Sequence, residues 1–284
     1  MNAPLDQYGV IGHPIAHSWS PFIHATFARQ TGQAIAYRLH DVAPEQFRDH
    51  VLDFAASGGR GLNVTIPHKI AAAALATELS ERARRAGAVN TLKLEDERIL
   101  GDNTDGAGLV RDLCANLGLA LAGCRILLIG AGGAARGVIG PLLALDPSQV
   151  VIAARTGDKA RALTAAFPGA PARLSGCALS ELPRGPFDLL INATSSSLSG
   201  EIPAIADAAV GPMTTCYDMA YSSTPTPFER WALDRGCERA VQGWGMLVEQ
   251  AAESFELWRG VRPDTTPVLA LLVSGRGTRT SIAE

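Results

Sequence analysis

Two polar groups in the first part of the chain could together move a proton. Lys69 directly follows the segment Gly61-Leu-Asn-Val-Thr-Ile-Pro-His68, and Asp105 lies near the end of Gly101-Asp-Asn-Thr-Asp-Gly106. Reduction of a ketone needs a hydride donor and a proton donor near the carbonyl oxygen. A lysine can give that proton, an aspartate can orient the lysine, and such acid–base help contributes about 10²–10⁴-fold. Lys69 and Asp105 are therefore the candidate catalytic pair.

The predicted helix around Lys69 favours a functional role for this side chain. Pro67 is expected to open an alanine-rich helix running towards Leu79, which places Lys69 in the first turn. A cation there meets the positive end of the helix dipole and is disfavoured by about 0.3–1 kcal/mol. The alternatives are an ordinary surface lysine and, for Asp105, a simple turn residue before Gly106.

A polar strand face precedes the lysine. Residues 61–66 alternate as a strand, with Ile66 among the apolar residues on one face and Asn63 and Thr65 sharing the other. A small hydroxylated ring could be held by this polar pair just before Lys69.

Other elements are expected around this strand. Tyr8–Gly12 is typical of a short strand, and Ser20 followed by Pro21 is typical of the N-cap and first residue of a helix. Ala88–Leu94 and Ile99–Thr104 predict a hairpin.

A glycine-rich loop in the middle of the chain predicts a dinucleotide site. The apolar strand Ile126–Ile129 runs into Gly130-Ala-Gly-Gly-Ala-Ala135, and a helix follows. Gly130, Gly132 and Ala135 have the spacing of G-x-G-x-x-A. Such glycines let the backbone approach a pyrophosphate, and the helix N-terminus offers free N–H groups. The alternative is a merely tight turn between strand and helix.

The end of the next predicted strand indicates which dinucleotide binds. A strand that serves NAD normally ends in an acid that holds the ribose 2′-hydroxyl. Val150–Ala154 instead leads into Arg155 and Thr156, with Lys159 close behind. A guanidinium can clamp a 2′-phosphate and a threonine can donate to it, so NADP is favoured. Asp158 is a nearby acid that complicates this interpretation, and the two basic residues could instead be solvated surface charges.

The alternation of strands and helices after residue 107 predicts an α/β fold with a doubly wound parallel sheet. Phe187–Ala193 and Thr215–Ala220 are further buried strands, Gly245–Trp258 is a long amphipathic helix, and Pro267–Val273 starts another. We expect a Rossmann-like NADP-binding domain at 107–242. The expected substrate-binding domain spans 1–106 and is completed by helices in 243–284.

Composition excludes several other classes of protein. The 284 residues are 47% hydrophobic and 19% charged, with a net charge of −3, which indicates a globular protein without a surface for nucleic acid. The five cysteines form no C-x-x-C pair, and His13, His17 and His68 match no zinc spacing, so no metal is expected.

The first ten residues are not typical of a secretory signal, and glycines, Arg136 and Pro141 interrupt the apolar stretch after Ile126. We expect a cytoplasmic protein, monomeric or homodimeric, with no membrane partner.

Taken together, these segments resemble the shikimate dehydrogenase family over essentially the full chain. The likeness also includes Gly12-His13-Pro14, Ser18-Trp-Ser-Pro21, Gly87-Ala-Val-Asn-Thr91, Asn192-Ala-Thr-Ser-Ser196, Tyr217-Asp-Met-Ala-Tyr221 and Gly243-Trp-Gly-Met-Leu247 with Gln250. The resemblance implies NADPH-dependent reduction of 3-dehydroshikimate to shikimate in aromatic amino acid biosynthesis. It also implies two α/β domains with the active site in the cleft between them.

The resemblance further assigns roles to individual residues. The residues that would hold the substrate are Ser18, Ser20, Asn63, Thr65, Lys69, Asn90, Asp105, Tyr221 and Gln250, with Lys69 and Asp105 catalytic. The residues that would carry NADP are Gly130, Ala131, Gly132, Gly133, Ala134, Ala135, Arg155, Thr156 and Lys159, with Met219 and Gly243 beside the nicotinamide.

Several of these roles have structural alternatives. Asn90 could be an ordinary strand-edge amide, and Met219 and Gln250 could fill a core. The chain also departs from the family pattern in two places. Ala154 stands where the family commonly has asparagine, so one hydrogen bond near the adenosine would be lost. Ser197 stands where glycine is frequent, which would tighten a loop near the cofactor.

Two other functions remain open from sequence. A related dehydrogenase could oxidise quinate, or quinate and shikimate, with NAD; Arg155 at the end of the second strand argues against NAD. A non-catalytic dinucleotide-binding sensor is the other alternative, and the intact pair Lys69/Asp105 argues against it.

Overall fold

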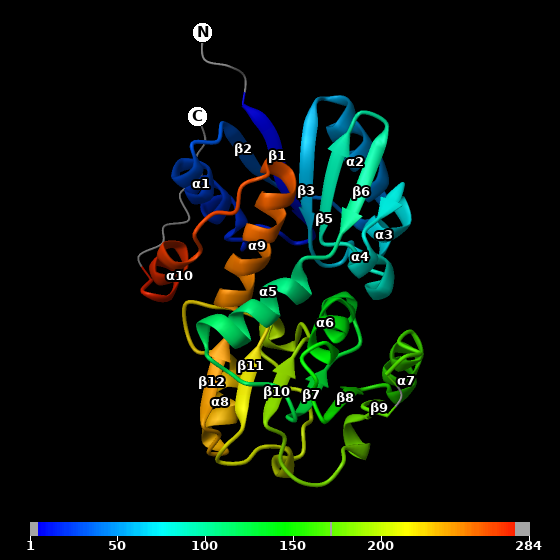
Figure 1. The fold of residues 1–284 in the computed structure, drawn as a ribbon, viewed down its shortest axis with the longest axis vertical. Coiled ribbons are helices and arrows are strands. Elements are labelled where there is room, and N and C mark those ends of the chain that lie inside the picture. Colours follow the sequence, from blue (N-terminus) through cyan, green and yellow to red (C-terminus); the bar gives the residue numbers. More distant parts are fainter. Residues whose placement is uncertain (1–4, 171, 276–284) are drawn as a thin grey trace. The chain divides into compact units, whose positions relative to one another are not determined.

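The chain folds into two compact units (Figure 1). The computed structural model describes residues 5–170 and 172–275. One unit runs to Gly108 and resumes at Leu247, and the other is Leu109–Met246. The boundaries fall inside helices α5 (Asp105–Arg111) and α9 (Trp244–Arg259), a few residues after those predicted at 106 and 242. Residues 1–4, 171 and 276–284 of the predicted domains lie outside the described residues.

The first unit is built on a mixed six-stranded sheet in the order β2-β1-β3-β5-β6-β4. Its strands are β1 (Asp6–Gly12), β2 (Ile35–Asp41), β3 (Gly59–Val64), β4 (Glu78–Leu79), β5 (Thr91–Glu95) and β6 (Arg98–Asp102). β1 is parallel to both of its neighbours, whereas β5 is antiparallel to β3 and to β6. The predicted hairpin is therefore the pair β5–β6.

Helices bury their apolar faces against both sides of this sheet. They are α1 (Ser20–Thr31), α2 (Phe47–Ala56), α3 (Lys69–Leu75), α4 (Glu81–Ala86), α9 and α10 (Thr266–Val273). Val51 of α2 and Ala72 of α3 share a core with Leu62 of β3. On α1 and α9, Phe27 and Phe255 meet with ring centroids 5.8 Å apart. Each large buried side chain stabilises this arrangement by about 1.5–3 kcal/mol.

Three details of the first unit differ from the sequence prediction. The N-cap of α1 is Trp19, so Ser20 is the first helical residue rather than the cap. β3 ends at Val64, and Ile66 is 52% exposed instead of facing the core, because the chain turns at Pro67. Helix α3 ends at Leu75 rather than near Leu79, since the chain then joins the sheet as β4.

The second unit has an all-parallel six-stranded sheet in the order β12-β11-β10-β7-β8-β9. Its strands are β7 (Arg125–Ile129), β8 (Gln149–Ala154), β9 (Leu174–Ala178), β10 (Leu189–Asn192), β11 (Thr215–Asp218) and β12 (Arg239–Gln242). The predicted doubly wound parallel sheet is confirmed. The edge strands β9 and β12 were not predicted, because only partial burial leaves them without a continuous apolar run.

Both faces of the second sheet are covered. The main helices are α6 (Gly133–Leu143), α7 (Gly157–Ala165) and α8 (Pro227–Asp234). Ile126 and Leu128 of β7 face a core with α6, whereas Leu127 and Ile129 face a core with α8. This two-sided burial explains the unbroken apolar run of β7. Within residues 5–170 and 172–275, no helix combines the length and the apolarity that crossing a membrane requires.

Candidate active site

Lys69 and Asp105 form an ion pair in the first unit. The Lys69 Nζ atom lies 2.5 Å from Asp105 Oδ2, and the two side chains are 13% and 5% exposed. Each residue begins a helix, α3 and α5 respectively. The N-terminus of a helix favours a carboxylate such as Asp105 and disfavours an ammonium such as Lys69. The ion pair with Asp105 offsets this unfavourable position of the Lys69 charge.

Asp105 is held in place by a second set of contacts. Asn90 Nδ2 donates to Asp105 Oδ1 at 2.9 Å and also lies 3.2 Å from Gln250 Oε1. The Asp105 backbone N–H donates to Asn103 Oδ1 at 3.2 Å. Asn90 thus occupies Oδ1 of Asp105, and Oδ2 accepts from Lys69. The held carboxylate in turn fixes the position of the Lys69 ammonium.

Asn63 lies in a buried polar network on β3. Tyr37 donates its hydroxyl to Asn63 Oδ1 at 2.7 Å, and Asn63 Nδ2 donates to Ser254 Oγ at 2.8 Å. Its predicted companion Thr65 is half-buried in the loop beyond the end of the strand. The two side chains therefore do not share one strand face as the alternation predicted.

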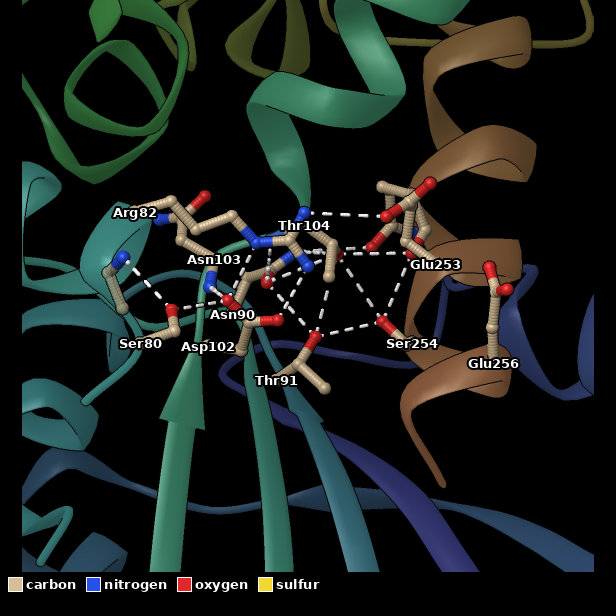
Figure 2. A network of polar contacts seen from close by, with 12 residues as sticks. Ser80, Arg82, Asn90, Thr91, Asp102, Asn103, Thr104, Glu253, Ser254 and Glu256 are labelled. Carbon is tan, nitrogen blue, oxygen red and sulfur yellow. Dashed lines mark hydrogen bonds and ion pairs between the residues drawn. The ribbon is translucent and has the colours of Figure 1, made fainter. Parts of the chain in front are cut away.

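An ion pair on α4 supports the turn before Asp105. Arg82 donates from Nε and Nη2 to the carboxylate of Asp102, at 2.7 and 2.5 Å, and Ser80 donates to the same group (Figure 2). Burial alone would raise the pKa of Asp102, but the hydrogen bonds from Arg82 hold it below its usual range. Asp102 Oδ1 accepts from the backbone N–H of Asn103, so the ion pair fixes the start of the 102–105 turn.

The other predicted substrate residues fall into two groups. Ser18 donates to Ser20 Oγ at 3.1 Å in the first unit, which also contains Gln250. Tyr221 belongs to the second unit, where its ring centroid lies 4.7 Å from that of Trp244.

The glycine loop of the second unit turns from β7 into α6. Gly130 adopts a φ of +113°, a conformation that L side chains rarely take, and its N–H donates to Ala153 O at 2.8 Å. Gly132 is the N-cap of α6, and a Cβ added there would meet nothing within 4 Å. The free amides at the N-terminus of this 11-residue helix are groups that can bind an anion, and Gly132 has space around it.

Basic residues follow β8 as predicted, and the nearby acid is paired. Arg155, Thr156 and Lys159 are exposed at the start of α7. Asp158 accepts from Arg161 at 2.9 Å. Arg161 therefore offsets the charge that would oppose a 2′-phosphate.

Met219 and Gly243 are brought into direct contact. A Cβ on Gly243 would lie 2.5 Å from Met219 O, so glycine is required for this approach. Beside them, burial raises the pKa of Asp218, which accepts hydrogen bonds from Ser197 at 2.6 Å and Thr226 at 2.7 Å. Ser197 thus ties its loop to β11.

Three histidines make structural contacts. His13 pairs with Asp41 at 2.7 Å, and His68 lies 2.8 Å from the carbonyl oxygen of Val42. His24 stacks on Tyr37 at a centroid distance of 4.2 Å, and complete burial lowers its pKa to about 3. His24 is therefore neutral at ordinary pH.

Comparison with known proteins decides the family. Residues 10–92 match the shikimate dehydrogenase substrate binding domain. Residues 113–200 match the shikimate / quinate 5-dehydrogenase family, and 243–273 match the shikimate 5'-dehydrogenase C-terminal domain. The shikimate dehydrogenase (NADP(+)) of Alkalilimnicola ehrlichii is 55% identical over 94% of this chain and 98% of its own. The chain belongs to the shikimate dehydrogenase family.

Solved structures extend the likeness to the shikimate dehydrogenase fold. Shikimate 5-dehydrogenase of Thermus thermophilus, in complex with NADP(H) and shikimate, has a TM-score of 0.83 at 31% identity, over 96% of this chain and 100% of its own. An Ael1 enzyme from Pseudomonas putida has a TM-score of 0.87 at 44% identity, over 94% and 98%. The family and fold inferred from the sequence motifs are thus confirmed.

Three polar residues that contact Asn63 were given no role from the sequence. Tyr37, Thr91 and Ser254 all bond to Asn63, yet they lie on β2, β5 and α9. Ser254 could have been predicted from the sequence, because it lies one turn after Gln250 on the same helix face. Thr91 ends the family segment Gly87–Thr91 but no role was drawn from it, and Tyr37 had no sequence signal, since register between distant strands decides the contacts of both.

Proposed function

We propose that the chain is an NADP-dependent shikimate dehydrogenase that interconverts 3-dehydroshikimate and shikimate, as a step of aromatic amino acid biosynthesis. The observation that carries this proposal is the ion pair of Lys69 with the buried Asp105, in a chain 55% identical to a shikimate dehydrogenase (NADP(+)). A binding sensor has no need of a lysine held in this way.

The first unit supplies groups that suit a hydroxylated ring acid. Asp105 and Asn63 present oxygen atoms that can accept from ring hydroxyls, and Lys69 can donate with the N–H groups that Asp105 leaves free. Ser18 and Ser20 provide hydroxyl donors for a carboxylate. Further contacts to the same substrate are assigned to Thr65, Asn90, Tyr221 and Gln250.

Lys69 carries the proton in this proposal. In the direction of ketone reduction its ammonium protonates the developing alkoxide, and in the reverse direction its amine accepts the hydroxyl proton. Asp105 keeps the group oriented at 2.5 Å and stabilises its charged form. The low exposure of the two side chains limits competition from water, which strengthens the interaction of Lys69 with the reacting oxygen.

The second unit fits NADP. NADPH, when bound, supplies the hydride for ketone reduction. The backbone from Gly130 to Ala135 would hold the pyrophosphate, and Arg155, Thr156 and Lys159 would hold the 2′-phosphate. The contact between Met219 and Gly243 offers a surface for the nicotinamide ring.

We also propose that the enzyme works in the cytoplasm, as a monomer or a homodimer. All five cysteines are free thiols, which suits a reducing compartment.

A four-way assay tests the function. Purified protein is given shikimate or quinate with NADP⁺ or NAD⁺, and formation of reduced cofactor is followed by absorbance. The proposal expects the highest kcat/KM for shikimate with NADP⁺. A preference for quinate with NAD⁺ would point to the related quinate enzyme, and no turnover in any combination would point to a sensor.

A further inference from the structure

Two buried hydroxyl groups lie between the amides of Asn63 and Asn90. Thr91 on β5 and Ser254 on α9 are both 0% exposed. Their Oγ atoms are 2.8 Å apart, and Figure 2 shows them facing each other beneath Asn90 and Thr104. Neither hydroxyl has access to solvent, so each must find its partners inside this network.

The hydrogen-bond partners allow a consistent placement of the protons of Asn63, Thr91 and Ser254. Asn63 Nδ2 donates to Ser254 Oγ at 2.8 Å and to Thr91 Oγ1 at 3.2 Å. Ser254 then donates to Thr91, which uses its own proton on Asn90 Oδ1 at 3.0 Å. If Ser254 instead donates to Gln250 O at 3.0 Å, the proton of Thr91 can still go to Asn90. Thr91 thus links the network to Asn90, as does Thr104 Oγ1, which lies 3.3 Å from Ser254 Oγ and 2.8 Å from Asn90 Nδ2.

The backbone N–H of Thr104 fixes which end of the Asn90 amide faces Asp105, and the Thr91 hydroxyl adds a second donor to the same oxygen. Asn90 Oδ1 accepts from Thr91 and from the backbone N–H of Thr104 at 2.8 Å. A rotated amide would place its NH₂ group against that backbone donor, and this arrangement is excluded electrostatically. Asn90 Nδ2 must therefore point towards Asp105 Oδ1, the atom it meets at 2.9 Å.

We propose that Thr91 is a positioning residue for the reaction: its hydroxyl donates to Asn90 Oδ1 and, together with the backbone N–H of Thr104, anchors the amide whose Nδ2 supports Asp105 beside Lys69. The inference rests on the proposed function, because it gives Thr91 a part in shikimate turnover. Thr91 touches no reacting group, and its effect passes through Asn90.

A matched pair of variants separates the hydroxyl from the shape of the side chain. Thr91→Val keeps the shape and removes the hydroxyl, whereas Thr91→Ser keeps the hydroxyl. We expect Thr91→Val to lower kcat/KM for shikimate about tenfold, equivalent to about 1.4 kcal/mol, with KM for NADP⁺ within about twofold. Thr91→Ser should keep kcat/KM for shikimate within about threefold of wild type. Because Thr91→Ser loses a methyl group and Thr91→Val does not, lost packing would impair the serine variant and not the valine variant.

Two further variants complete the test. Thr214→Val removes another buried hydroxyl, one that donates to Phe187 O at 2.6 Å in the second unit, and should leave kcat/KM for shikimate unchanged. In an Asn90→Ala background, Thr91→Val should cost less than about threefold, because its target is gone.

The outcomes distinguish this inference from the proposed function. Wild-type protein that neither binds nor oxidises shikimate would overturn both. Active wild type with an equally active Thr91→Val would overturn the positioning role alone. The same holds if Thr91→Ser is as impaired as Thr91→Val, if Thr214→Val shows the same loss, or if the full loss persists without the Asn90 amide.

Discussion

Replacing Lys69 by alanine should stop proton transfer and leave the fold intact. Positioned acid–base groups contribute about 10²–10⁴-fold, so kcat for shikimate oxidation should fall at least about a hundredfold. That loss corresponds to at least about 2.7 kcal/mol of transition-state stabilisation. KM for NADP⁺ should change little, because the predicted cofactor residues lie in the second unit.

The structure also sets the cost to stability. Asp105 is 5% exposed and loses its ion-pair partner, but it keeps the hydrogen bond from Asn90 at 2.9 Å. A buried group that loses one of its partners costs about 1–3 kcal/mol, below the about 5–15 kcal/mol that holds a typical protein folded. Lys69→Ala should therefore remain folded by circular dichroism, with a lowered melting temperature.

Steady-state rates of NADPH formation, followed by absorbance, give the comparison. Lys93→Ala is the control, since Lys93 pairs with Glu95 at 2.6 Å in the same unit and lies outside the site. It should retain wild-type kcat within about twofold. A folded Lys69→Ala protein with wild-type kcat would refute the proton-transfer role.

Four further results follow from the same structure. Arg155→Ala should raise KM for NADP⁺ about tenfold to a hundredfold and leave KM for NAD⁺ nearly unchanged; equal effects would mean that the guanidinium does not touch the 2′-phosphate. Gly132→Ala should melt like wild type, since a Cβ there meets nothing within 4 Å, yet raise KM for NADP⁺ at least about tenfold; unchanged KM would argue against close approach of the pyrophosphate. Burial lowers the pKa of His24 from 6.5 to about 3. Between these values His24 is protonated in the unfolded chain and neutral in the folded protein. Stability should then fall with decreasing pH in that window, and His24→Phe should reduce the slope by about 1.4 kcal/mol per pH unit in denaturant titrations; an unchanged slope would contradict the neutral buried ring. Arg82→Ala should lower the free energy of unfolding by about 2–3 kcal/mol, because its partner Asp102 is only 5% exposed. Arg85→Ala on the same helix should cost less than about 1 kcal/mol, because its pair with Glu81 is exposed. Similar losses in both variants would show that the buried pair contributes no more to stability than the exposed one.

Much of the second unit could be predicted from sequence. The run of β7 is apolar on both faces, and the glycine loop after it has fixed spacing, so strand, loop and helix were all located. The edge strands escaped because a half-buried strand such as β12 carries no periodic signal strong enough to stand out.

The first unit was harder to predict because its contacts are set by tertiary structure. Lys69 and Asp105 were paired by chemical reasoning, and the structure places them 2.5 Å apart. The network around Asn63 depends on the register of β5 against β3 and on the placement of α9, which no local pattern reports. The N-cap prediction at Ser20 failed for a different reason, since Ser20 donates its backbone N–H to Ser18 Oγ and begins the helix itself.

A crystal structure with shikimate bound would test the central claim most directly, by the distance from Lys69 Nζ to the substrate oxygen that loses its proton. We predict hydrogen-bonding reach, about 2.6–3.2 Å, with Asp105 still in contact with the lysine. Shikimate bound with that oxygen far from Lys69 and served by another side chain would contradict the account.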